Sequence, residues 1–137
     1  MSASLALSDA VLARLRSDAG VVALVAQRIW DHAPERPAYP HITLGPSDAV
    51  PDDADCIAMR TETIQIDVWG RDQGKKWPTR VLVDAVKRAL HDRELDLGSG
   101  ARAVLRVMLM RVLPDPDGIT THGVLQVEAV TEEEADG

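Results

Sequence analysis

The chain has 137 residues, the length of one domain, and its 22 acidic against 15 basic side chains give a formal net charge of −7. An acidic surface repels phosphate backbones, and three Trp, one Tyr and no Phe provide no aromatic platform for stacking bases, so general nucleic-acid binding is disfavoured. The one cysteine, Cys56, excludes an internal disulfide, and we recognise neither a signal peptide nor an apolar run long enough for a membrane span.

Apolar residues at helical spacing predict two helices near the N-terminus. The first covers Leu5 to Leu15, and a shorter one covers Val21 to Ala26 with Asp18 as its N-cap. Residues 28–30 then begin an extended segment. Three prolines between His32 and Pro40 exclude regular structure from that stretch.

A short strand, His41 to Gly45, is predicted to end on its glycine. Residues 46–60 follow as a polar loop with two prolines and four aspartates (Asp48, Asp52, Asp53 and Asp55). Fifteen residues is long for a loop in a compact domain, so we expect this one to be either functional or disordered.

Residues 61–91 form the centre of the predicted fold. Residues alternate from Thr61 to Trp69, which predicts a strand with Ile64, Ile66 and Val68 on its apolar face and Trp69 on its polar face. A turn follows at Gly70–Gly74. An amphipathic helix comes next, and its first turn must accommodate Pro78, which requires a start near Gly74. Four of its residues should pack against the strand: Leu82, Ala85, Val86 and Ala89.

The C-terminal part predicts a long β-hairpin. Leu95–Leu97 is a minimal strand, and residues 102–113 and 119–131 alternate on either side of a tight reversal at Pro114–Gly118. The predicted fold is therefore α+β: a mainly antiparallel sheet of about four strands, with a mixed sheet as the alternative, covered on one face by helices. We predict a single domain over 1–131 and a flexible acidic tail over 132–137.

One motif is similar to a phosphate-binding loop. Gly70-x-x-x-Gly74-Lys75-Lys76 lies between a strand and a helix, where backbone amides and a lysine can hold phosphates. Its glycine spacing is one residue short, and Lys76 replaces the Ser or Thr that would hold magnesium. We therefore favour a turn with a solvated basic corner, and nucleotide binding through Gly70–Lys76 remains the alternative.

Other candidate chemistry has simpler explanations. The histidines lack carboxylate or cysteine neighbours at metal-ligand spacing, and His91 suits a helix C-terminus. Asp115-x-Asp117-Gly118 is similar to the opening of a calcium loop but lacks the later ligands. Cys56 has no basic neighbour in sequence to activate it. We predict no catalytic, cofactor-binding or metal residues. The four histidines are His32, His41, His91 and His122.

Five segments, taken in order, resemble one family. The resemblance spans about Leu5 to Thr131 and is to the tail terminator, or tail-completion, proteins of long-tailed phages and phage-derived gene transfer agents. The segments are Gln27–Asp31, Ala38–Leu44, Val68–Arg71, Val86–His91 and the hairpin Arg111–Leu125.

This resemblance implies a structural protein of the virion that is assembled in the host cytoplasm. Such proteins form a ring, generally a homohexamer, at the head–tail junction. The ring caps the tail tube, stops its polymerisation and joins it to the head-completion (stopper) protein. A negative lumen would let DNA pass without sequence-specific binding. No catalytic residue, cofactor or metal is implied.

The polar strand face and the acidic loop have no internal partner in the predicted fold, so they provide the candidate contact residues. These are Asp48, Asp52, Asp53, Asp55, Trp69, Asp115 and Asp117. Besides the nucleotide-binding accessory protein, the alternative is another neck or tail protein, such as a stopper or a tube subunit.

Overall fold

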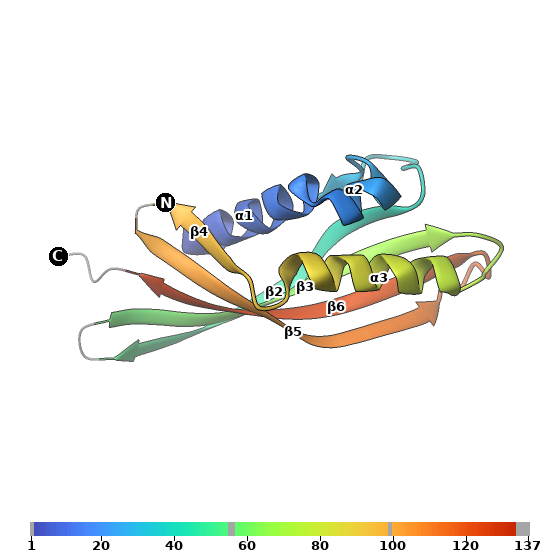
Figure 1. The fold of residues 1–137 in the computed structure, drawn as a ribbon. Coiled ribbons are helices and arrows are strands. Elements are labelled where there is room, and N and C mark those ends of the chain that lie inside the picture. The colour runs from blue at the N-terminus through green and yellow to red at the C-terminus, as the bar shows by residue number, and fades with distance from the viewer. Residues whose placement is uncertain (1, 55–56, 99, 134–137) are drawn as a thin grey trace.

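The computed structural model describes residues 2–54, 57–98 and 100–133, where three helices cover one face of a six-stranded sheet (Figure 1). The helices are α1 (Ala3–Ser17), α2 (Ala19–Val25) and α3 (Trp77–Leu90). The strands are β1 (Ile29–Trp30), β2 (His41–Ala54), β3 (Ile57–Arg71), β4 (Glu94–Gly98), β5 (Ala101–Pro114) and β6 (Thr120–Glu133). They lie in the order β1-β2-β3-β6-β5-β4.

The predicted α+β class and the one-sided helical cover are confirmed, but the expected count of about four strands is too low. The four long strands β2, β3, β6 and β5 pair with one another in an antiparallel arrangement. The two-residue strand β1 pairs parallel with β2, which makes the sheet mixed, and β4 pairs only with the start of β5. A two-residue strand is too short to show an alternating pattern. Arg16 helps to hold β1, because its guanidinium donates to the Ile29 carbonyl at 2.7 Å.

The helix boundaries follow from local capping. The Asp18 carboxylate accepts a hydrogen bond from the Val21 amide at 3.0 Å and caps α2, as predicted. Helix α3 begins at Trp77 and not near Gly74. Pro78 therefore lies in the first turn, where an amide has no intrahelical partner to lose.

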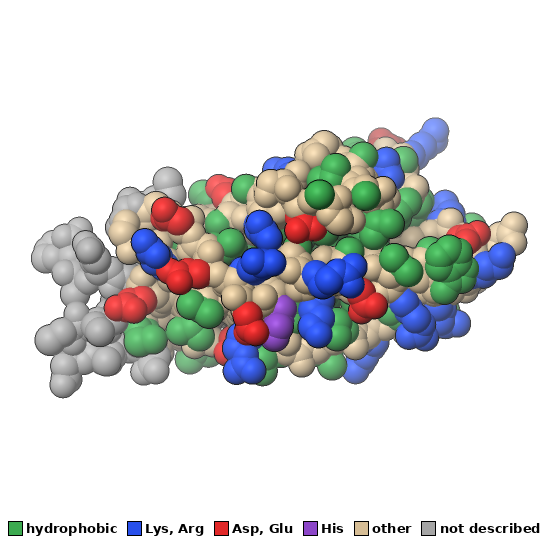
Figure 2. Space-filling model, viewed as in Figure 1, with side chains coloured by type: hydrophobic (Ala, Val, Ile, Leu, Met, Phe, Trp, Pro, Cys, Tyr) green, Lys and Arg blue, Asp and Glu red, His purple; other side chains and the backbone are tan. Residues whose placement is uncertain are grey.

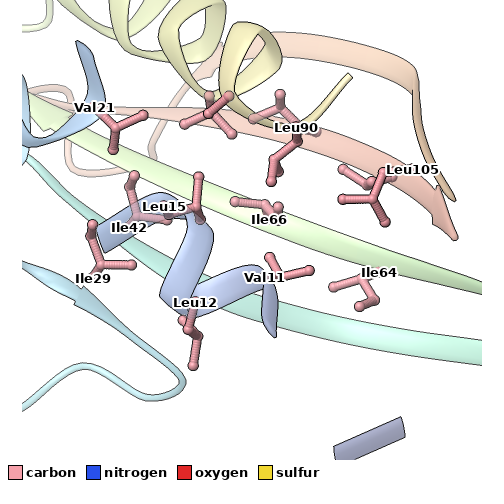
Figure 3. Close-up of a cluster of buried hydrophobic side chains, with 14 of the residues drawn as sticks. Val11, Leu12, Leu15, Val21, Ile29, Ile42, Ile64, Ile66, Leu90 and Leu105 are labelled. Carbon is pink, nitrogen blue, oxygen red and sulfur yellow. The ribbon is translucent and has the colours of Figure 1, made fainter. Parts of the chain in front are cut away.

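The core fills the space between the helices and the sheet (Figure 3). Ile64, Ile66 and Val68 of β3 are buried, as their alternation predicted. They share one cluster with the four α3 residues predicted to face them, all of which are buried, and with α1 side chains such as Leu15. Burying such aliphatic side chains stabilises the fold by about 1.5–3 kcal/mol each.

Gly123 of β6 sets how closely α3 approaches the sheet. A Cβ built there would overlap side-chain atoms of Val68 and Val83. Any larger residue would therefore move the helix away from the strand or displace both valines.

Residues 46–54 and 57–60 form strands, so the predicted loop is wrong over this part. Strand β2 continues to Ala54, and β3 begins at Ile57 and pairs with it down to Ala54↔Ile57. We call residues 47–54 and 57–62 the arm; it projects beyond the helical layer (Figure 1). Pro46 and Pro51 indicated a loop, but within the described residues β2 has no strand partner on its outer side beyond Thr43. An edge strand tolerates proline there.

The predicted C-terminal hairpin is confirmed, with 14 residues in each of β5 and β6. A bulge between Val107 and Leu109 shifts the register. Strand β6 runs to Glu133, so the first two residues assigned to the acidic tail belong to the strand, and residues 134–137 lie outside the described part. No helix in the described part combines the length and the apolar character that crossing a membrane requires.

Candidate functional site

The sheet face that the helices leave uncovered carries a row of stacked rings. Trp69 lies against His122 with ring centroids 3.9 Å apart and planes within 7°. His41 lies on the other side of Trp69, at 6.4 Å between centroids. The register explains this row, because His41, Trp69 and His122 are direct partners across β2, β3 and β6. The Trp69 indole also donates to the Thr43 hydroxyl at 3.1 Å.

Residues 30–40 enclose His41 at the end of this row. The rings of Trp30 and Tyr39 lie 5.6 and 4.8 Å from the imidazole, and Nδ1 lies 3.0 Å from the Ala38 carbonyl. Burial lowers the pKa of His41 below its usual value of 6.5, and the positive charges of nearby arginines lower it further. Burial of the His41 ring thus disfavours its charged form.

Hydrogen bonds connect the polar side chains along the same face. His122 Nε2 lies 2.7 Å from the Asp67 carboxylate, and the Gln65 amide donates to that carboxylate at 2.9 Å. Gln126 in turn donates to Gln65 at 3.0 Å. Such a chain fixes each side chain in place and presents a stiff polar surface. Trp69 lies on this polar surface, as its place on the polar face of the predicted strand indicated.

The predicted acidic contact residues are not brought together. Asp48 is exposed on the arm, the backbones of Asp52 and Asp53 lie in β2 close to the arm's tip, and Asp55 falls outside the described residues. Asp115 and Asp117 lie in the β5–β6 turn, at the opposite end of the sheet.

Asp117 holds that turn through its carboxylate. It accepts from the Thr120 hydroxyl at 2.6 Å and from the Ile119 and Thr120 amides at 2.9 and 2.8 Å. The Thr120 hydroxyl, followed by its amide, holds the pKa of Asp117 below its usual value, and Arg71 lies 3.6 Å away. Turn formation thus accounts for the Asp115-x-Asp117-Gly118 pattern.

The Gly70–Lys76 segment uses its amides within the fold. The Gly74 amide donates to the Ile119 carbonyl at 3.1 Å, and the Lys75 amide donates to the Asp72 carbonyl at 2.9 Å. In a phosphate-binding loop, these amides would point at the anion. The observed geometry is that of the turn favoured from the sequence.

The remaining candidates have structural positions. His91 follows α3 as its C-cap, as predicted, and its Nδ1 accepts from the Val107 amide at 3.0 Å. His32 is exposed, and Cys56 lies outside the described residues. Across the described ranges, no three His, Cys, Asp or Glu side chains are placed to hold a metal ion.

Reasoning from the sequence missed a basic surface. Figure 2 shows Lys and Arg side chains gathered over α3 and the adjoining part of β5. The spacing of Lys76, Arg80 and Lys87 in the sequence could have indicated it, because these positions fall near one side of a helix. We define the basic surface by Lys76, the N-cap of α3, by Arg80, Lys87 and Arg88 on α3, and by Arg111 on β5.

Comparisons with known proteins agree with this architecture. The model of one protein family, described as "Tail completion protein gp17", matches residues 9–132. Among solved structures, the chain is similar to a chain from the virion of a native gene transfer agent (GTA) particle. The identity is 25%, the TM-score is 0.86, and the match covers 96% of this chain and 98% of that chain.

It is also similar in fold to the bacteriophage SPP1 gp17 protein, with 24% identity, a TM-score of 0.62, and 98% of this chain and 94% of that chain covered. Among curated proteins, none matches the chain. The family match covers most of the sequence and agrees with the resemblance stated above. The chain therefore belongs to the tail completion protein gp17 family and is a structural protein of a phage or gene transfer agent virion.

Proposed function

We propose that the protein is a tail terminator that assembles as a ring, hexameric by the family resemblance, at the head–tail junction. The ring caps the finished tail tube, stops tube polymerisation, joins the tube to the head-completion (stopper) protein and lets DNA pass. The observation that carries the proposal is the agreement with a GTA virion chain over 98% of that chain's length, at a TM-score of 0.86.

The physical character of the surface supports a role in assembly. The hydrogen-bonded outer face from Gln65 to His122 is stiff and polar, which suits a surface that contacts other subunits. Among the described residues, two long strands also leave part of their edges open, and open edges accept further chains. A net charge of −7 disfavours retention of DNA inside a lumen.

Deletion of the gene tests termination directly. Without a terminator, tube subunits should polymerise past their normal length, and heads should accumulate without tails. Electron microscopy of particles from the deletion strain measures both quantities. Tails of normal length joined to heads would contradict the proposal.

Complementation of the deletion strain with point variants tests whether the function is structural or depends on one binding residue. Individual substitutions of solvated or packing residues should leave particle assembly nearly intact, provided that each variant folds. Loss of assembly confined to the lysine variants, with folding retained, would instead support nucleotide binding. The residues to replace are His32, His41, His91, Lys75 and Lys76.

The place of the protein in the particle distinguishes a terminator from its neighbours. Cryo-electron microscopy should locate it between the tail tube and the stopper. A position within the tube, or next to the portal side of the neck, would favour the tube-subunit or stopper alternative.

A further inference from the structure

Two strands of the sheet leave one side unpaired, and they do so at opposite edges. On β5, pairing with β4 ends at Glu94↔Val104. Beyond that pair, the Asp92 amide donates to the Leu105 carbonyl, and the Val107 amide donates to Nδ1 of His91. Within the described residues, no strand covers the far side of β5 from Met108 to Pro114. We call this stretch the β5 edge.

The other open edge belongs to β2. Strand β1 pairs with β2 only at Ile42 and Thr43, so the arm's outer side has no partner strand among the described residues. Pro46 and Pro51 interrupt any ladder there, because neither has an amide hydrogen to donate. This leaves Ser47–Val50, between the two prolines, as the stretch that can pair with another chain.

Apolar side chains are exposed at both edges. Met108, Leu109 and Met110 on the β5 edge are 56%, 42% and 43% exposed. Val50 on the arm is 64% exposed. An open edge that also exposes apolar side chains favours association with another chain, unless charges oppose it.

The charges differ in sign between the two edges. The β5 edge carries Arg111 and adjoins Arg80 of the basic surface across a hollow of about 240 Å³, which these two arginines line together with one aspartate, Asp84. The arm's open stretch carries the exposed Asp48. Pairing two β5 edges would place like charges together, as would pairing two arms. Pairing the β5 edge with an arm places opposite charges together.

The directions of the strands allow this pairing. From β2 to β5 the sheet passes through three antiparallel contacts, so β2 and β5 run in opposite directions. A second copy laid beside the first in the same orientation therefore brings its β2 antiparallel to β5.

The two open stretches also lie at different heights along the sheet. Asp52 of the arm is level with Arg102 through the register Asp52↔Met59, Met59↔Glu132 and Arg102↔Glu132. Copies must therefore be offset along the strands. Strands tilted relative to a ring axis, by about 35–45° as in barrels, provide such an offset.

We infer that the β5 edge binds the arm of a second copy of this chain, through Ser47–Val50 and the exposed Asp48 within this stretch. The contact joins two different surfaces and so repeats from copy to copy, which closes a ring or continues as a chain. It rests on the proposed ring and assigns the surfaces that form it.

Cysteine cross-linking tests this contact in a background where Cys56 is replaced by serine. Val50→Cys and Met110→Cys place one thiol on each surface, at exposed positions whose loss should not affect folding. A short bis-maleimide should join a Val50→Cys chain to a Met110→Cys chain, and neither chain alone should form a product. The double variant should form a ladder of multimers. Ala13→Cys, exposed on α1, is the control and should form none.

Charge reversal provides the second measurement. Arg111→Glu should lower the yield of the Val50–Met110 product roughly tenfold, since it replaces attraction by repulsion. Adding Asp48→Arg to that variant should recover most of the yield. A Met110→Cys product formed with itself would overturn the inference, and so would equal yields from all charge variants.

Cross-linking in assembled particles distinguishes the two proposals. If the protein is located at the tail end but gives no Val50–Met110 product there, the terminator role stands and this contact is wrong. If deletion leaves tails normal, the terminator role fails, and cross-linking of the purified chain still decides the contact.

Discussion

Trp69 is held from three sides on the outer face of the sheet. His122 stacks on one face of the indole, His41 lies beyond the other, and Thr43 accepts the indole hydrogen. Each partner comes from a neighbouring strand, so these rings connect β2, β3 and β6 independently of the apolar core. Aromatic pairs of this kind contribute about 0.5–1.5 kcal/mol beyond the area they bury.

His41 should make stability depend on pH. Its pKa is lowered in the fold, mainly by burial, so the unfolded chain takes up a proton that the folded chain resists. The free energy of unfolding should therefore keep its full His41 contribution above the unfolded pKa of 6.5. That contribution should be lost as pH falls from 6.5 toward the folded pKa. The charged or titratable groups facing His41 are Arg28, Arg71, Tyr39, Asp31 and His32.

Urea unfolding of the parent and of His41→Gln, measured from about pH 5 to 8, checks this. The stability difference between the two proteins should shrink as pH falls below 6.5. His32→Gln reports what loss of an exposed imidazole does alone. A parent-minus-variant difference that is constant with pH would show that His41 is not the responsible group.

At the scale of elements, β6 and β5 differ in what their amides do. Strand β6 lies between β3 and β5, and Val127 is opposite Ile64 on one side and Val107 on the other. Whichever way its amide points, it meets a partner strand. Val107 is different, because its amide donates to the His91 ring and not to β6. The hairpin therefore depends more on the backbone of β6 than on that of β5.

Proline substitution should reveal this difference. Val127→Pro removes a ladder donor in a central strand and should cost about 3 kcal/mol or more, enough to prevent particle assembly. Val107→Pro removes one hydrogen bond to His91 and should cost less, of the order of 1–2 kcal/mol. Thermal unfolding of both variants, with complementation scored in parallel, measures the two effects. Equal destabilisation would contradict this view of the hairpin.

At the scale of the whole molecule, the net charge of −7 conceals an uneven distribution. Basic side chains gather over α3 and the β5 edge (Figure 2), whereas the arm exposes Asp48. Within the described part of a single chain, neither the basic side chains nor Asp48 of the arm is covered by a surface of opposite charge. In copies placed side by side, each surface would face its complement.

Salt should therefore weaken association between copies without destabilising the fold. Raising ionic strength from about 0.05 to 0.5 M shortens the Debye length severalfold and screens exposed charge pairs. The yield of the Val50–Met110 cross-link should fall over this range. The midpoint of thermal unfolding should change little, because the core of each copy is apolar. A yield that stays constant or rises with salt would indicate an apolar contact instead.

Local patterns were sufficient for most elements and for the core. The alternation around Ile66 and the helical spacing around Val86 predicted which sides are buried, because one apolar face must find another. The residue types at Asp18 and in Pro114–Gly118 were enough to predict a helix cap and a turn at these positions. The ordered series of segments was also enough to indicate the family, which the family match confirms.

Only the tertiary structure determined the features that depend on which strands are neighbours in the sheet. Pro46 and Pro51 indicated a loop, because local rules do not show that β2 is an edge strand whose outer amides need no partner. The ring row of His41, Trp69 and His122 depends on the register of three strands far apart in sequence. The separation of Arg111 from Asp48 likewise follows from the strand order, which places β5 and β2 on opposite sides of β3 and β6.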